Sequence, residues 1–126
     1  MMDYSVTIKE SSRDLSARER IKMKDFSNAI QLDAACDEDK VTIAPVAWTL
    51  LSVHNEHAKD GNTEYNKFIV IDKDGQKFVT GSATFHKSFM EIWDEMAEVG
   101  EDFEIEVFKL PSKNYKGKSF LTCSIL

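Results

Sequence analysis

The chain has 126 residues, of which 42% are hydrophobic and 10% aromatic, and its formal net charge is -6. This length fits one domain, and this composition excludes a disordered chain. The acidic balance, with a pI near 5.0, excludes a protein that coats nucleic acid over its whole surface. It still permits a protein that binds nucleic acid in one groove and has its basic residues gathered on that face.

The compartment can be predicted from what the sequence lacks. No apolar stretch approaches membrane-spanning length, and the first residues lack the basic start and apolar run of a signal peptide. Cys36 and Cys123 lie in unrelated contexts, and their spacing suits neither a disulfide framework nor a zinc site. We therefore expect a reduced, cytoplasmic protein without membrane contacts.

The N-terminal third shows two local signals and one ambiguous stretch. Residues 1–10 alternate enough to predict a short strand or an ordered arm. Ser16, followed by Glu19 three residues later, forms a capping-box pattern that predicts a helix start. Residues 22–32 fit neither the helical nor the strand period, and we expect an irregular strand that ends in a turn near Asp33.

The central third of the chain is predicted to form strands. Residues 41–54 are rich in Val, Thr, Ile, Trp and Leu, which favours a strand, and Pro45 within it implies an edge position or a bulge. Residues 67–72 and 76–80 are two further β-type runs. The Asp74-Gly75 pair between them is typical of a hairpin turn.

The last third contains the most regular pattern. Large apolar residues recur at helical spacing over residues 85–96, and Gly100 follows as a stop. Residues 103–110 and 119–126 then form a hairpin-like pair of strands. No repeat, linker or low-complexity tract interrupts the chain.

This element order predicts a mainly β fold. One amphipathic helix between the third and fourth strands is the order of a small β-barrel, the five-stranded Greek-key barrel of the OB type. We expect residues 1–126 to form a single OB-like domain. The alternative is an α+β domain with a helix packed on an open antiparallel sheet.

The sequence predicts no catalytic or metal site. It has no nucleophile elbow, no phosphate-cradling glycine loop and no acid pair at a helix-defined spacing. His54 and His57 lie three apart where a strand gives way to a loop, and no third ligand is close in sequence. We expect a protein that is not an enzyme and that uses no cofactor or metal.

The loop of residues 111–118 indicates an anion-binding edge. It contains Lys113, Tyr115, Lys116 and Lys118 and no acid, although the chain as a whole is acidic. Tyr65 lies in a similar polar context. An exposed ring beside lysines can stack a nucleobase while the ammonium groups meet phosphates. We predict stacking by Tyr115 and Tyr65, with Trp48 as a further candidate.

Four segments are similar to those of the small single-stranded DNA-binding proteins of phages and mobile elements of Gram-positive bacteria. These segments are residues 26–29, the 67–80 hairpin, the helix from Thr84 and the closing residues 111–123. The likeness covers about residues 25–126. It implies an OB-like fold without catalysis that coats and protects single-stranded DNA, without strong sequence preference, during phage or mobile-element replication.

The resemblance also implies a site and partners. It points to Lys113, Tyr115, Lys116 and Lys118, and to single-stranded DNA in the cytoplasm, which is the host's if a phage encodes the protein. Self-association along the strand and contacts with replication proteins belong to such a role. Many bacterial single-strand binders carry a disordered acidic tail, whereas this sequence ends within a predicted strand, so we expect no tail-mediated recruitment.

An alternative function follows from the acidic residues of 91–106. An acidic phage-type protein-interaction module could bind or inhibit a host factor through this face. Recovery of a host protein without nucleic acid would favour this alternative.

Overall fold

The computed structural model describes residues 4–55, 64–112 and 117–126. Within them the chain forms strands, and helices that range from one turn to more than four turns. In chain order the elements are β1 Tyr4–Ser11, α1 Ala17–Lys24, β2 Ile30–Gln31, α2 Leu32–Ala35, β3 Val41–Ile43, β4 Pro45–Asn55, β5 Glu64–Asp72, β6 Lys77–Thr80, α3 Ala83–Val99, β7 Ile105–Pro111 and β8 Ser119–Ile125.

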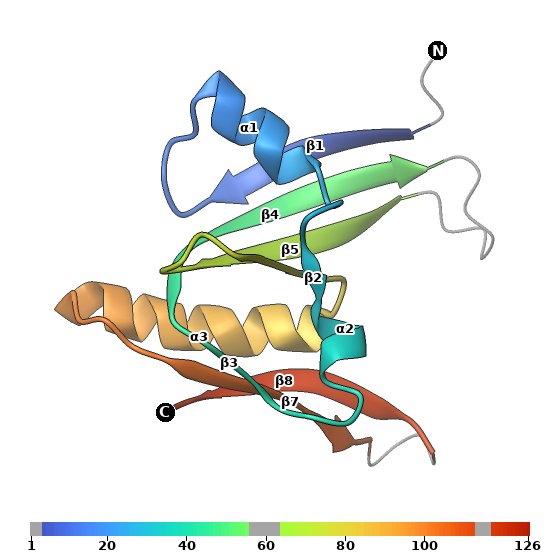
Figure 1. Cartoon of the computed structure of the whole chain (residues 1–126), viewed down its shortest axis with the longest axis vertical. Coiled ribbons are helices and arrows are strands. Elements are labelled where there is room, and N and C mark those ends of the chain that lie inside the picture. The colour runs from blue at the N-terminus through green and yellow to red at the C-terminus, as the bar shows by residue number, and fades with distance from the viewer. Residues whose placement is uncertain (1–3, 56–63, 113–116) are drawn as a thin grey trace.

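The strands form two separate sheets (Figure 1). The larger sheet has five strands in the order β1-β4-β5-β6-β2, antiparallel except for the short parallel pair β2-β6. The smaller sheet has three antiparallel strands in the order β3-β7-β8. The prediction of a mainly β fold is therefore confirmed.

The predicted closed barrel is absent from the described residues, and the open sheets agree with the alternative of a helix packed on an open antiparallel sheet. Both sheets are open, and α1 and α2 accompany the predicted helix α3. The barrel prediction failed because strand order along the chain does not determine which strands pair. None of the described helices has the length and apolar character needed to cross a membrane.

Helices cover both faces of the five-stranded sheet. In Figure 1, α1 lies above this sheet, and α3 lies between it and the three-stranded sheet. A small apolar cluster that includes Met23 of α1 and Leu51 fills the α1 side. The larger cluster contains Phe85 and Phe89 of α3 together with Phe68 of the five-stranded sheet and Val107 of the three-stranded sheet. One core therefore joins both sheets through α3.

The boundaries of α3 agree with its predicted pattern. Phe85 and Phe89, one helical turn apart, are fully buried. The Ser82 hydroxyl accepts a hydrogen bond from the Phe85 amide at 3.1 Å and caps the start of the helix. Gly100 ends the helix in the left-handed conformation, at φ +70°, which glycine adopts without steric cost.

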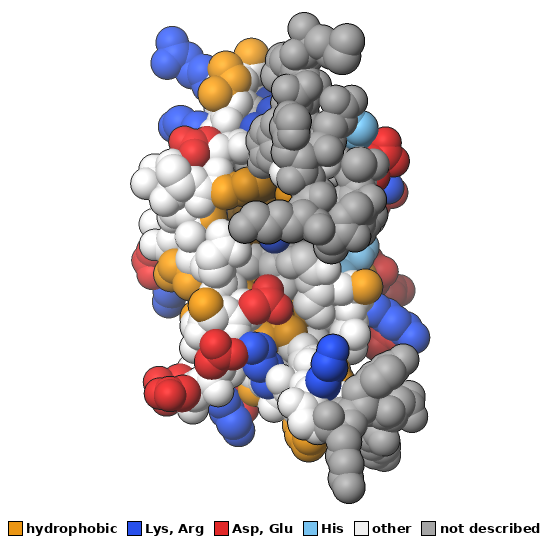
Figure 2. All heavy atoms as spheres, turned by 90° about the vertical axis from the view of Figure 1, so that its right-hand side faces the viewer, with side chains coloured by type: hydrophobic (Ala, Val, Ile, Leu, Met, Phe, Trp, Pro, Cys, Tyr) orange, Lys and Arg blue, Asp and Glu red, His pale blue; other side chains and the backbone are white. Residues whose placement is uncertain are grey.

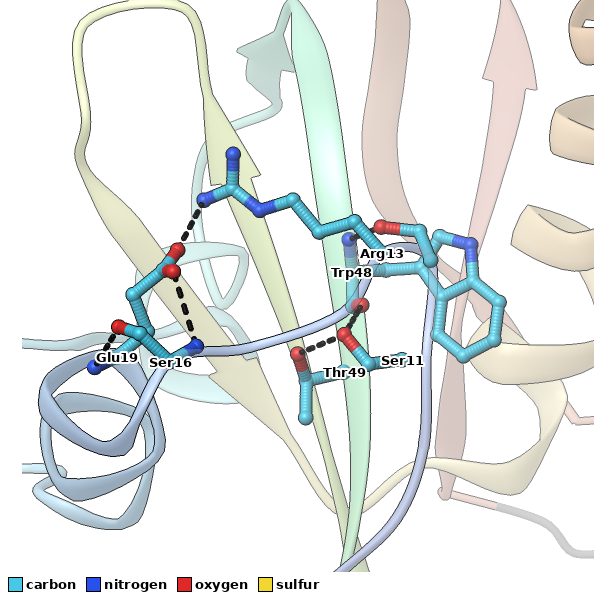
Figure 3. Close-up of polar contacts among 7 residues, drawn as sticks. Ser11, Arg13, Ser16, Glu19, Trp48 and Thr49 are labelled. Carbon is cyan, nitrogen blue, oxygen red and sulfur yellow. Dashed lines mark hydrogen bonds and ion pairs between the residues drawn. The ribbon is translucent and has the colours of Figure 1, made fainter.

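The predicted capping box of α1 is also confirmed (Figure 3). The Glu19 amide donates to the Ser16 hydroxyl at 3.2 Å, and the Ser16 amide donates to the Glu19 carboxylate at 3.1 Å. Arg13 adds an ion pair to Glu19 at 3.2 Å. The irregular strand predicted over residues 22–32 is wrong, since α1 extends to Lys24 and only Ile30–Gln31 is β.

The apolar run over residues 41–54 forms two strands rather than one. β3 ends at Ile43 and joins the three-stranded sheet, whereas β4 begins at Pro45 and joins the five-stranded sheet. The predicted irregularity at proline is present as a register shift between Pro45 and Ala47. The Ala44 carbonyl accepts from the Lys73 amide at 3.0 Å, which fixes the crossing between sheets.

Candidate nucleic-acid interface

The predicted closing hairpin forms, although most of its predicted site residues lie outside the described part of the chain. β7 and β8 pair from Ile105 with Ile125 to Pro111 with Ser119. Lys118 directly precedes β8 and is exposed. Lys113, Tyr115 and Lys116 fall in residues 113–116, which the structure does not describe, so their role stays a prediction.

Two other lysines near this hairpin are bound to acids. The Lys109 ammonium donates a hydrogen bond to the Asp37 carboxylate, and this bond raises the pKa of Lys109. Lys40 pairs with Glu106 at 3.2 Å. Both charges are locally compensated. Lys118 has no acidic partner among the described residues and remains available to a phosphate.

Tyr65 and Lys67 lie where β5 extends past β6. β6 pairs with β5 only between Phe68 and Ile71, so within the described residues the stretch 64–67 pairs with β4 alone. The Lys67 ammonium lies 5.8 Å from the centroid of the half-buried Tyr65 ring. This places a cation against an aromatic face at an open sheet edge.

A hollow of about 260 Å³ opens beside this edge, and we call it the β5 hollow. Its lining consists of polar residues and of apolar residues that belong to the core. The lining residues are Leu50, Tyr65, Asn66, Phe68, Thr80, Gly81, Ser82, Ala83 and His86. Its volume is below the range of about 300–1,000 Å³ that is usual for drug-sized ligands. It therefore has room for a small planar group rather than a large cofactor.

His86 is the titratable group of the β5 hollow. Its ring packs against Phe68 in a tilted arrangement with the centroids 4.5 Å apart, and the side chain is half-buried. Burial lowers the pKa of His86 below its ordinary value, and Glu10 partly opposes this effect. The imidazole is therefore mainly neutral at pH 7 and offers a hydrogen-bonding edge without a fixed charge.

Trp48 does not belong to this interface. The residue is 7% exposed and packs against Phe68, at 5.8 Å between ring centroids. In Figure 3 its indole is turned towards α3, away from the polar contacts that its backbone makes with Ser11 and Ser12. The ring has no free face on the surface, so the predicted stacking role is wrong for this conformation.

No protein-family model matches the chain, and no curated protein or solved structure matches it significantly. The site is therefore argued from its own geometry. The family resemblance drawn from the sequence stays a prediction.

The charge along α3 separates into two halves. Residues 83–90 contain His86 and Lys87 and no acid, whereas residues 91–99 contain four acids and no cation. Lys87 is exposed and has no acidic partner among the described residues. The first half adjoins the β5 hollow and packs on β8, where the Ser88 and Thr122 hydroxyls are 3.0 Å apart. The sequence did not single out Lys67, His86 or Lys87, because only the packing of α3 assembles them.

These groups lie on one side of the molecule. In Figure 1 the start of α3, the end of β4, the start of β5 and the start of β8 all lie to the right. Figure 2 views that side and shows acidic and basic side chains interspersed rather than sorted into a continuous patch. Any contact with phosphates would thus involve individual lysines, which agrees with the acidic net charge.

Proposed function

We propose that the protein binds single-stranded nucleic acid, with DNA as the expected form, across the side that contains the β5 hollow and Lys118. The observation that supports this most is the Tyr65–Lys67 pair at an open sheet edge. An aromatic face beside an ammonium that has no acidic partner among the described residues suits a base stacked next to a phosphate. Lys87 on α3 and Lys118 next to β8 are two further exposed lysines without an acidic partner among the described residues.

The β5 hollow limits what the site accepts. Its size suits one nucleobase, inserted between Tyr65 and His86, with Asn66 available to hydrogen-bond its edge. A paired base in a duplex cannot enter such a hollow without leaving its stack. The proposed binding is therefore specific for single strands and tolerant of sequence. It uses a sheet edge and a hairpin, and does not require the OB-type barrel that the resemblance implies.

The experiment is fluorescence anisotropy of a labelled oligo-dT at low and moderate salt, with unlabelled duplex as competitor. We expect salt-sensitive binding that duplex does not displace. Tyr65→Leu should weaken binding at least about fivefold, since a stacked base contributes about 1–3 kcal/mol. Lys67→Gln and Lys118→Gln should each reduce the salt slope by roughly 0.7.

Lys73→Gln is a matched control, because it removes one exposed lysine just after the end of β5, which lies at the opposite side in Figure 1. If Lys73→Gln weakens binding as much as Lys67→Gln, the interface is elsewhere. No binding at micromolar protein in low salt would refute the function itself.

A further inference from the structure

The opposite end of the molecule exposes an unusual concentration of apolar surface. Seven large hydrophobic side chains are exposed among the described residues, and four of them are Val46, Val99, Ile125 and Leu126. In Figure 1 the start of β4, the end of α3 and the C-terminus all lie to the left. Val46 and Leu126 line one hollow in this region, and exposed apolar side chains gathered in this way are typical of interaction sites.

Two adjoining hollows indent this end. Their volumes are about 500 and 240 Å³, and both are lined by Pro45, Val46, Asp102 and Phe103. Those four residues form the ridge between the hollows, and we call the whole the acidic groove. Leu126 borders the larger hollow, where its backbone amide donates to the Glu104 carbonyl at 2.9 Å. The main chain therefore holds one wall in place.

The rim of the acidic groove is negatively charged. Glu101, Asp102 and Glu104 are exposed, and none has an ion-pair partner within residues 4–55, 64–112 and 117–126. Lys73 is the one cation among the lining residues that the structure describes. The last turns of α3 add acids at Glu95 and Glu98, where the negative end of the helix dipole disfavours them. A cationic ligand would relieve both sources of repulsion.

We propose that the acidic groove binds a polypeptide segment of a partner protein in which apolar side chains alternate with arginine or lysine. The apolar side chains would occupy the two hollows on either side of Val46, and a basic side chain would face Asp102 across the ridge. A second copy of this chain fits less well, because a symmetric contact would bring the same three acids from both copies together. Nucleic acid is excluded by the same negative charge.

This binding is independent of the proposed function, since the groove lies at the other end of α3 from the β5 hollow. The probe is a fluorescein-labelled dodecapeptide that alternates leucine with arginine, measured by anisotropy against the intact chain. Val46→Ser should weaken binding about tenfold, the effect of exposing one buried valine-sized contact. Asp102→Asn with Glu104→Gln should weaken it further at low salt and little at high salt.

Matched controls separate a docking site from general attraction to an acidic protein. Ile21→Ser removes another exposed apolar side chain, and Glu38→Gln removes another exposed acid, both away from the groove. Neither should change peptide binding, and circular dichroism melts should confirm that every variant is folded. A peptide with serine in place of leucine should bind at least about tenfold more weakly.

Three outcomes would overturn the proposal. One is equal binding of the leucine and serine peptides, which would indicate charge attraction alone. Another is a Val46→Ser variant that binds the peptide like the parent. The third is sedimentation showing a dimer that Val46→Ser dissociates, which would assign the groove to a second copy. Oligo-dT binding by Val46→Ser should equal that of the parent, so the two proposals fail separately.

Discussion

At the residue scale, His86 connects the core with the proposed interface. Burial lowers its pKa from the ordinary 6.5, so the unfolded chain takes up this proton more readily than the folded one. The resulting stability is fully present above about pH 6.5 and is lost as the pH falls below that value. Urea unfolding at pH 7 and 5.5 should therefore show a smaller pH dependence in His86→Phe, which keeps a ring against Phe68. An unchanged dependence would show that His86 is not the responsible group.

Residue-level prediction from the sequence was most limited where tertiary packing decides the environment. Tyr65 was expected to be an exposed ring among polar neighbours, but it is half-buried, and its stacking role stays a prediction. Trp48 was misjudged because both faces of β4 are buried, one by α1 and the other by α3. Such a strand lacks the alternation of apolar and polar residues that distinguishes buried from exposed positions in a sequence. The β5 hollow was missed for a related reason, since its lining comes from three segments that only tertiary packing brings together.

At the scale of elements, the end of α3 depends on one backbone conformation. Gly100 has φ +70°, and no described atom outside its adjacent chain residues lies within 4 Å of where a Cβ would stand, so a substitution meets strain rather than a clash. Gly100→Ala should cost about 1 kcal/mol of unfolding free energy, and Gly100→Asn should cost less because asparagine tolerates this conformation. Urea denaturation of both variants measures the difference. Equal costs would point to lost packing instead.

Elements with their own sequence signals were predictable, and elements defined by distant partners were not. Local patterns of a few residues determine three of the observed features, namely the α3 helix, the Asp74-Gly75 turn and the Ser16–Glu19 capping box. The division of residues 41–54 into β3 and β4 depends on β7, which pairs with β3 from more than fifty residues away. No local propensity encodes that choice.

At the scale of the whole molecule, one aromatic core holds both sheets together. Phe89 is fully buried and contacts Phe68 of the five-stranded sheet at 5.2 Å between centroids, and the same cluster includes residues of the three-stranded sheet. Phe89→Ala should lower the unfolding free energy by about 3–5 kcal/mol. Tryptophan fluorescence and far-UV circular dichroism should report the same single transition in urea.

Ile21→Ala is the control for this prediction, because Ile21 is 70% exposed on α1. Its effect should stay within about 0.5 kcal/mol. Two separate transitions in the Phe89→Ala variant would mean that each sheet holds its own structure without the shared core.

The pairing of β3 with β7 also has a consequence for how fast the chain folds. The hairpins β5–β6 and β7–β8 join neighbouring segments and can form within microseconds, whereas β3 must wait for β7 and β1 for β4. Because these strands pair across long stretches of sequence, the fold has a high contact order. The chain loses the conformational entropy of closing such long loops before it gains their stabilising contacts. Refolding therefore proceeds at the rate at which remote segments meet, on a scale of milliseconds to seconds rather than microseconds.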